Sequence, residues 1–104
     1  MRLLTEELRE EFTRVGDTSE KKATDVKVVC KFFDPTGSWT WYATEGREEG
    51  NDFIFFGFVR GFENELGYFT LSELTSVELP FRLGIERDLH FGNHTLAEVM
   101  EKRI

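Results

Sequence analysis

The chain has 104 residues and a formal net charge of −7, from 20 acidic and 13 basic side chains. This length suits one domain spanning residues 1–104 with a single core. An acidic surface repels nucleic-acid phosphates, so direct nucleic-acid binding is not expected. The same charge keeps a protein soluble, and it also leaves open a protein that imitates nucleic acid toward a DNA-binding partner.

Cysteine usage and the N-terminal segment indicate the compartment. The only cysteine, Cys30, excludes an internal disulfide and suits a reducing environment. The segment MRLLTEELREEF is acidic and amphipathic, unlike a signal peptide. The apolar run at residues 53–59 is far shorter than a membrane span. These features predict a cytoplasmic protein without membrane contact.

The first predicted element is a helix of about ten residues that begins after Thr5. Glu6 and Glu7 fall in its first turn, where carboxylates oppose the positive end of the helix dipole. Gly16 is a suitable end, and residues 17–25 read as a polar loop. The predicted apolar stripe, which would dock on a sheet, is Leu4, Leu8, Phe12 and Val15.

Three strands are predicted next, at residues 26–33, 38–45 and 53–62, because these segments are rich in β-branched and aromatic residues. The segment DPTG, residues 34–37, forms the first turn. Residues 46–52 close the second hairpin.

Two glycines, Gly57 and Gly61, fall on one face of the third strand, and a glycine inside a strand marks a close approach by a neighbour. A symmetrical second hairpin sets Trp41 opposite Gly57 and Trp39 opposite Val59, so that indole rings cover the bare backbone.

These registers predict which residues share each face of the sheet. The face that carries the two glycines is the more mixed one, and it is expected to hold Lys27, Val29, Lys31, Phe33, Trp39, Trp41 and Glu45. The opposite face is expected to form the main core, with Cys30, Phe32, Tyr42, Phe56 and Phe58.

The C-terminal part adds shorter elements. Residues 66–69 form a fourth strand, and a capping box from Thr70 to Glu73 opens a short helix over residues 71–77. Residues 85–91 are a candidate fifth strand. A second capping box, starting at Thr95, opens a C-terminal helix. The predicted fold is therefore α+β: an antiparallel sheet of four to five strands built from hairpins, with an N-terminal, a short middle and a C-terminal helix.

No Gly-rich phosphate loop, nucleophile elbow, paired-cysteine zinc pattern or histidine-pair metalloprotease motif is present. Asp88, His90 and His94 are potential metal ligands, but the intervening Gly92 and Asn93 suit a loop, so no metal is predicted. No cofactor is expected either. Cys30 alternates with valines and is assigned to the core.

Three groups of side chains are candidates for binding or chemistry. Trp39, Trp41 and Tyr42, beside Lys31, form a stacking or cation-binding surface, unless they only pack on the glycines. Arg87 either binds a ligand or joins a structural ion pair with a neighbouring acid. Several glutamates could provide a carboxylate pair for acid and base catalysis, or simply be solvated: Glu45, Glu63, Glu65, Glu73 and Glu86.

Four segments resemble a bacterial family known only as a domain of unknown function: LLTEEL, KFFDPTGSWTWYATEG, FFGFVRGFENELGYFTLSEL and GIERDLHF. The resemblance implies a short cytoplasmic protein carried on plasmids, integrative elements or phages, sometimes fused to DNA-transaction proteins. It implies no catalytic residues. The signature positions are Trp39, Trp41, Tyr42, Glu45, Gly61, Glu63, Glu65, Leu66, Gly67, Tyr68, Glu73, Glu86, Arg87 and Asp88.

Two functions follow as hypotheses. The first is an accessory protein of a mobile element that binds a protein partner through an acidic or aromatic surface, with anti-defence as one such role. The second is a small enzyme or ligand-binding domain that uses a glutamate cluster near Trp41. The candidate binding residues are Trp39, Trp41, Glu45, Glu63, Glu65 and Arg87.

Overall fold

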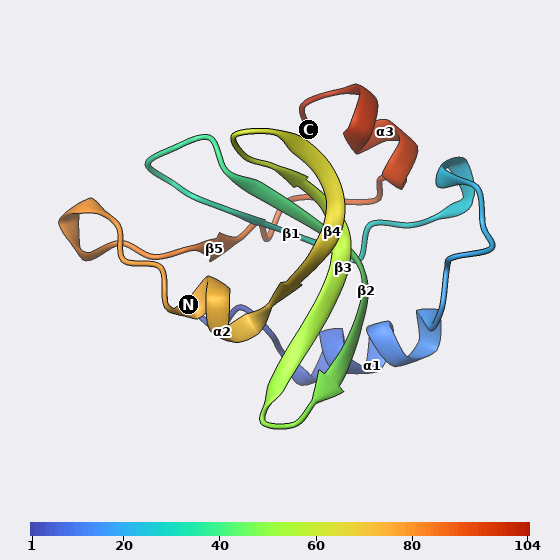
Figure 1. Cartoon of the computed structure of the whole chain (residues 1–104), viewed down its shortest axis with the longest axis horizontal. Helices are drawn as coiled ribbons and strands as arrows, with labels where there is room; N and C mark the ends of the chain where they lie inside the picture. Colours follow the sequence, from blue (N-terminus) through green and yellow to red (C-terminus); the bar gives the residue numbers. More distant parts are fainter.

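The structure is a computed structural model that describes all 104 residues (Figure 1). Its elements are α1 (Glu6–Val15), the 3-10 turn η1 (Ala23–Asp25), β1 (Cys30–Phe33), β2 (Thr40–Glu49), β3 (Asp52–Arg60), β4 (Asn64–Thr70), α2 (Leu71–Thr75), the 3-10 turn η2 (Pro80–Arg82), β5 (Glu86–Arg87) and α3 (Leu96–Glu101). The strands form one antiparallel sheet in the order β4-β3-β2-β1-β5. The predicted α+β fold is confirmed.

The helices begin where their caps predict. The Thr5 hydroxyl accepts a hydrogen bond from the Leu8 N–H at 3.2 Å, and α1 ends at Gly16 with a φ of 64°. Such a positive φ suits glycine. In α3, the Thr95 hydroxyl and the Glu98 carboxylate form the predicted capping box. None of the three helices combines the length and the apolar character that crossing a membrane requires.

Both faces of the sheet are covered, by two separate apolar clusters. The larger cluster packs beneath α1 and α2 and contains Leu3, Leu4, Phe12, Cys30, Phe32, Ala43, Phe53, Phe55, Phe69, Leu74 and Ile85. The smaller packs beneath α3 and contains Val26, Val28, Tyr42, Phe58, Phe91, Leu96 and Val99. We refer to these as the α1 side and the α3 side. In Figure 1, α1 and α2 lie in the lower part of the view and α3 in the upper part.

The predicted faces of the first hairpin are wrong. Phe32 pairs with Trp41 and Lys31 with Tyr42, so Phe32 and Trp41 share the α1 side. The turn is longer than expected because Phe33 pairs with Thr40. Within it, the Asp34 carboxylate accepts hydrogen bonds from the Thr36 N–H at 2.7 Å and the Thr36 hydroxyl at 2.9 Å. An aspartate that bonds the backbone two residues on stabilises such a turn.

The predicted strand at residues 26–33 is shorter, because its first half leaves the sheet. The Val28 N–H donates to the His94 carbonyl at 2.9 Å, and the Leu96 N–H donates to the Val26 carbonyl at 2.8 Å. Val26 and Val28 consequently pack on the α3 side, whereas Cys30 packs on the α1 side. A single alternation of faces therefore does not run through this segment.

The predicted register of the second hairpin is also wrong, because the strands continue to a two-residue turn at Gly50 and Asn51 in place of the predicted loop at residues 46–52, and because β2 contains a bulge between Ala43 and Glu45. Ala43, rather than Trp41, lies opposite Gly57, and Trp41 lies opposite Val59. A Cβ at position 57 would overlap the backbone carbonyl oxygen of Tyr42. The extra residue of a bulge bends the strand, and Gly57 gives the bent backbone the room it needs.

The second glycine, Gly61, receives the Trp39 ring, which had been predicted to lie opposite Val59. A Cβ at Gly61 would overlap the six-membered ring of Trp39. One indole over one glycine is therefore confirmed, although the pair is Trp39 and Gly61 rather than Trp41 and Gly57.

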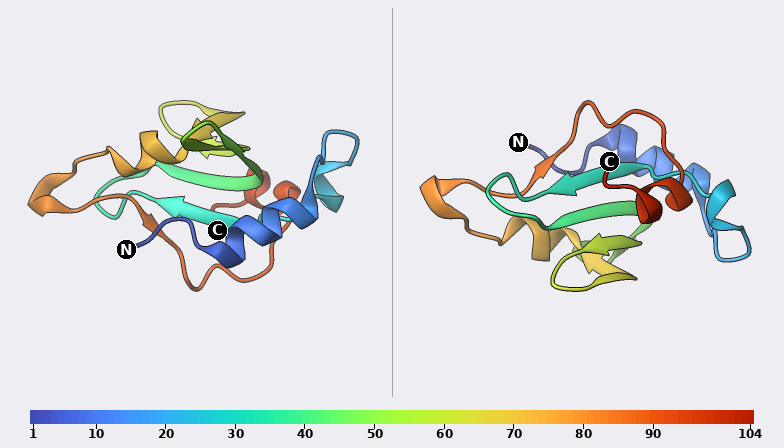
Figure 2. Two further views of the ribbon diagram at one scale, coloured as in Figure 1. Left: turned by 90° about the horizontal axis from the view of Figure 1, so that it is seen from below. Right: turned by 90° about the horizontal axis from the view of Figure 1, so that it is seen from above.

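The remaining elements differ from their predictions only in length. Helix α2 ends at Thr75, and β5 has two residues in place of the predicted 85–91. Strand β5 stops because the Asp88 carboxylate accepts a hydrogen bond from the His90 N–H at 2.9 Å, which turns the chain. Figure 2 shows two loops extending from opposite ends of the molecule, the orange one around residue 80 and the light-blue one around residue 20.

The Cys30 thiol is expected to be unreactive in the folded protein. Its side chain is buried, and burial raises its pKa to about 12. Because the thiolate is the nucleophile, Ellman's reagent at about pH 8 should label the unfolded chain in guanidinium fully and the native chain hardly at all. Rapid stoichiometric labelling of the native protein would contradict the buried position.

Candidate functional site

An aromatic cluster lies at the end of the sheet where Trp39 and the β3–β4 turn meet. The Trp39 and Trp41 rings stack with centroids 5.8 Å apart at 29°, and the Phe62 ring contacts Trp39 edge-on at 5.3 Å and 84°. Both indoles are half-buried, whereas Phe62 is 95% exposed. We call Trp39, Trp41 and Phe62 the Trp patch.

Local structure explains why these rings meet. Trp39 directly precedes β2, and Phe62 lies in the turn between β3 and β4. Gly61 lacks the side chain that would otherwise occupy the place of the Trp39 ring. The glycine therefore lets the indole lie against the backbone of the turn, where its outer edge meets Phe62.

Two glutamates of the β3–β4 hairpin border the Trp patch. Trp41 pairs with Val59, which pairs with Glu65, so Glu65 lies on the same face of the sheet as Trp41, two strands away with Val59 between them. Glu63 lies in the turn itself. Both are exposed, and neither carboxylate forms an ion pair. The patch thus combines apolar rings with uncompensated negative charge.

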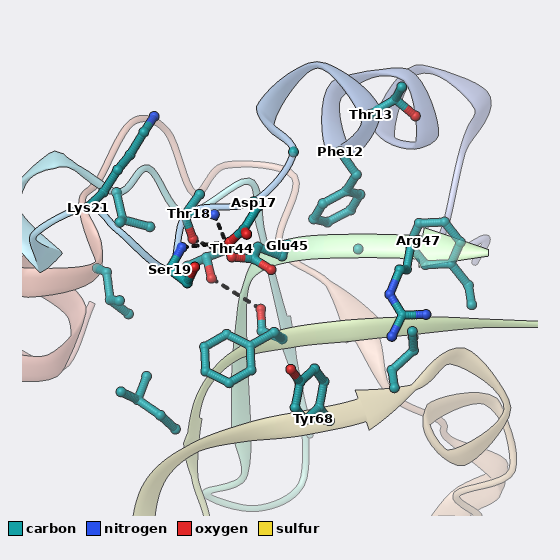
Figure 3. A pocket seen from close by; sticks show the side chains of 18 of the residues that line it. Phe12, Thr13, Asp17, Thr18, Ser19, Lys21, Thr44, Glu45, Arg47 and Tyr68 are labelled. Carbon is teal, nitrogen blue, oxygen red and sulfur yellow. Dashed lines mark hydrogen bonds between the residues drawn. The ribbon is translucent and has the colours of Figure 1, made fainter. Parts of the chain in front are cut away.

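The structure places Glu45 elsewhere, although the sequence assigned it to the face of the two indoles. Because of the bulge, Glu45 lies opposite Phe56 and shares the α3 side. Its Oε2 atom accepts hydrogen bonds from the Thr18 N–H at 2.7 Å and the Thr18 hydroxyl at 2.5 Å (Figure 3). Glu45 therefore fixes the loop that follows α1.

A cleft of about 970 Å³ lies between this loop and the uncovered end of the sheet. Figure 3 shows Thr18 and Lys21 from the loop, Glu45 and Arg47 from β2, and Tyr68 from β4 around it. The cleft mixes positive, negative and aromatic groups. Its polar centre, the carboxylate of Glu45, already bonds Thr18, and no cluster of metal-binding side chains occurs anywhere in the structure.

Arg87 lies in the same cross-strand row as Trp41, two strands away with Phe32 between them, but its guanidinium binds the N-terminal segment. Its Nη1 atom donates to the Arg2 carbonyl at 2.7 Å and the Leu3 carbonyl at 2.9 Å, which holds the N-terminal segment beside β5. The neighbouring Asp88 forms an ion pair with Lys31 at 3.5 Å. Of the other glutamates, Glu73 accepts a hydrogen bond from the Thr70 hydroxyl at 2.9 Å and Glu86 lies in β5. The structure does not gather the glutamates into one cluster.

Sequence reasoning missed the role of Arg60, the one charged residue in the apolar segment at residues 53–62. Arg60 is only 8% exposed, and its Nη2 atom donates to the carbonyls of Val99 at 2.6 Å, Lys102 at 3.3 Å and Met100 at 3.4 Å. Its guanidinium also lies 5.1 Å from the centroid of the Phe58 ring. Arg60 satisfies the terminal carbonyls of α3, which have no partner within the helix. The sequence signal that could have revealed this role was a charged residue at a predicted core position.

The carboxylates with lowered pKa values serve turns and helix ends. The Ser72 hydroxyl, at 2.5 Å, and the Phe53 N–H lower the pKa of Asp52. The Thr95 N–H lowers the pKa of Glu98, and the Ser19 N–H lowers the pKa of Asp17. Each donor favours the ionised form, so these groups stabilise local backbone structure.

Residues 3–102 match the family described as "Protein of unknown function (DUF2958)". The chain belongs to this family. The DUF2958 match spans every helix and strand described above. No curated protein and no solved structure matches the chain significantly.

Proposed function

We propose that this DUF2958 protein is a small cytoplasmic accessory protein of a bacterial mobile element that binds a protein partner through the Trp patch. The observation that carries the proposal is the exposure of Phe62 against the stacked pair Trp39 and Trp41. The mobile-element setting comes from the resemblance of the sequence segments to the family, and anti-defence is one role of a small acidic binding protein in that setting. The binding surface comes from the arrangement of the rings.

Energetics support recognition at this surface. Complete burial of an exposed phenylalanine side chain contributes about 1.5–3 kcal/mol, and aromatic residues are enriched at the centres of protein interfaces. The half-buried indoles beneath Phe62 are held in place by their own packing, so little side-chain entropy is lost on binding.

Charge suggests the character of the partner. Glu63 and Glu65 border the Trp patch without ion pairs, and the whole chain carries a net charge of −7. A basic partner surface would meet complementary potential and associate faster. A nucleic acid would be repelled by the same charges.

The alternative function, an enzyme or ligand-binding domain with a glutamate cluster near Trp41, has less support. It needs two of the glutamates predicted near Trp41 to meet in one cleft. Glu45 lies on the α3 side and bonds Thr18, whereas Glu65 lies on the α1 side. The cleft beside Glu45 is therefore separate from the Trp patch.

Affinity capture with a matched pair of variants tests the proposal. The immobilised protein is incubated with lysate of a bacterium that carries the corresponding mobile element, and bound proteins are quantified by mass spectrometry. Phe62→Ala should reduce recovery of the partner about tenfold. Phe81→Ala removes another ring, one that is 90% exposed and lies outside the Trp patch, and should leave recovery unchanged. Equal recovery with all three proteins, or no protein above background, would count against the proposal.

A further inference from the structure

Strand β4 has an open edge. It is the last strand of the sheet on its side, paired with β3 along Asn64–Thr70 and with nothing beyond. No backbone hydrogen bond from outside the β3–β4 hairpin reaches residues 64–69. The other outer strand, β5, has only two residues. The outward N–H and C=O groups of β4 are therefore free to pair with another strand.

Apart from the charge of Glu65, the usual protections of an edge strand are missing from β4. Its sequence, NELGYFT, contains no proline and no lysine. Its α3 side carries two apolar residues, Leu66 at 47% exposure and Tyr68 at 69%. Tyr68 projects toward the cleft described above (Figure 3). A strand added beside β4 would cover both side chains and extend the floor of that cleft.

We propose that β4 accepts an extended segment of the partner protein as an additional antiparallel or parallel strand, with a basic residue beside Glu65 and apolar residues beside Leu66 and Tyr68. This inference rests on the proposed function and specifies the partner. Added strands gain affinity from backbone hydrogen bonds and selectivity from alternating side chains. Glu65 and Leu66 point to opposite faces of the sheet, so they select opposite faces of the incoming strand.

The carboxylate of Glu65 favours a positively charged residue in the partner segment. It occupies the row Trp41, Val59, Glu65, so the next position outward along this row belongs to the partner. A lysine or arginine there places its charge beside the carboxylate while its aliphatic stem lies along the sheet. The incoming strand would thus continue the surface formed by the Trp patch.

A second copy of this chain fits the edge less well. Two copies would bring together two molecules that each carry a net charge of −7. An antiparallel pair centred on Gly67 would place each Glu65 beside Phe69 of the other copy, so neither carboxylate would gain a cation. The charge of the edge therefore favours a basic segment over self-association.

The probe is the fluorescein-labelled peptide KVKVKVK, whose valines all lie on one side and whose lysines all lie on the other in either strand direction. We expect saturable one-to-one binding by fluorescence anisotropy. Amide NMR shifts should be confined to the β3–β4 hairpin. The peptide KPKPKPK carries the same charge, but its prolines lack N–H groups and hold φ at about −65°, which disfavours pairing as a strand, so it should bind at least about tenfold more weakly.

Two protein variants with the same change of charge separate strand addition from general attraction. Glu65→Lys should weaken binding at least about fivefold, because it sets like charges side by side. Glu10→Lys changes an exposed residue of α1, which does not contact β4, and should stay within about twofold of the original affinity.

Three results would overturn strand addition: equal binding of both peptides, shifts outside the hairpin, or a dimer in sedimentation that produces the same β4 shifts without peptide. The capture experiment with Phe62→Ala is independent of these. If that capture succeeds and KVKVKVK fails, the proposed function stands and the open edge does not serve it.

Discussion

Alanine at position 57 is expected to lower the free energy of unfolding by at least about 3 kcal/mol. The added Cβ would overlap the backbone carbonyl of Tyr42, an atom that cannot rotate away as a side chain can. The bulge between Ala43 and Glu45 would have to open, and Glu45 would lose its bonds to Thr18. Urea unfolding followed by circular dichroism measures the change.

Gly67 provides the matched control. It lies in the neighbouring strand directly opposite Gly57, but a Cβ there would meet no atom within 4 Å. Gly67→Ala should therefore not lower the free energy of unfolding, and it should raise it by about 0.5–1 kcal/mol because glycine weakens strands. Similar destabilisation by the two substitutions would show that the bulge does not require glycine.

Removal of the Arg60 side chain is expected to have the second large effect, a loss of about 3 kcal/mol of stability for Arg60→Ala. The carbonyls of Val99, Met100 and Lys102 would lose their donor at the end of α3. The buried aliphatic stem would also leave a cavity. Thermal and urea unfolding of the variant and of the original protein measure the difference in the free energy of unfolding.

Arg47→Ala is the control for Arg60→Ala, because Arg47 is an exposed arginine of the adjacent strand whose ion pair with Glu49 lies in solvent. Exposed ion pairs contribute less than about 1 kcal/mol. The loss of stability for Arg60→Met should lie between the losses for Arg60→Ala and Arg47→Ala, because methionine fills part of the cavity but donates no hydrogen bond. If Arg60→Ala cost no more than Arg47→Ala, the carbonyl contacts would contribute little to stability.

The parts of the fold that depend on neighbouring residues were predictable from the sequence. The three helices begin after Thr5, Thr70 and Thr95, because a hydroxyl three residues before a free N–H can cap it without any help from distant segments. The four hairpin-connected strands followed from turn residues and β-rich runs in the same way.

Register could not be predicted because both faces of the sheet are apolar. When both faces are covered, a shift by one residue exchanges two apolar sets and leaves no polar residue conspicuously buried. The pairing of Phe32 with Trp41 depends on how the Asp34 turn closes. The departure of Val28 from the sheet depends on a distant partner, the carbonyl of His94.

The candidate site was predictable where its residues lie close together in the sequence. Trp39 and Trp41 are two residues apart at the start of β2, and Glu63 and Glu65 are two residues apart at the start of β4, so errors of register left each pair together. Glu45 was misplaced because a bulge has no reliable sequence signature. Phe62 was assigned to the strand and its exposure at the turn was not foreseen.

The division of the core into two unequal clusters affects how the molecule opens. The α3 side holds seven buried apolar residues and the α1 side eleven, so detachment of α3 exposes less surface than detachment of α1 with α2. Native proteins open in such units, each with its own free energy. Amide protons of α3 should then exchange with solvent deuterium through a partial opening, while those of β3, which is shared by both layers, exchange only when the whole chain unfolds.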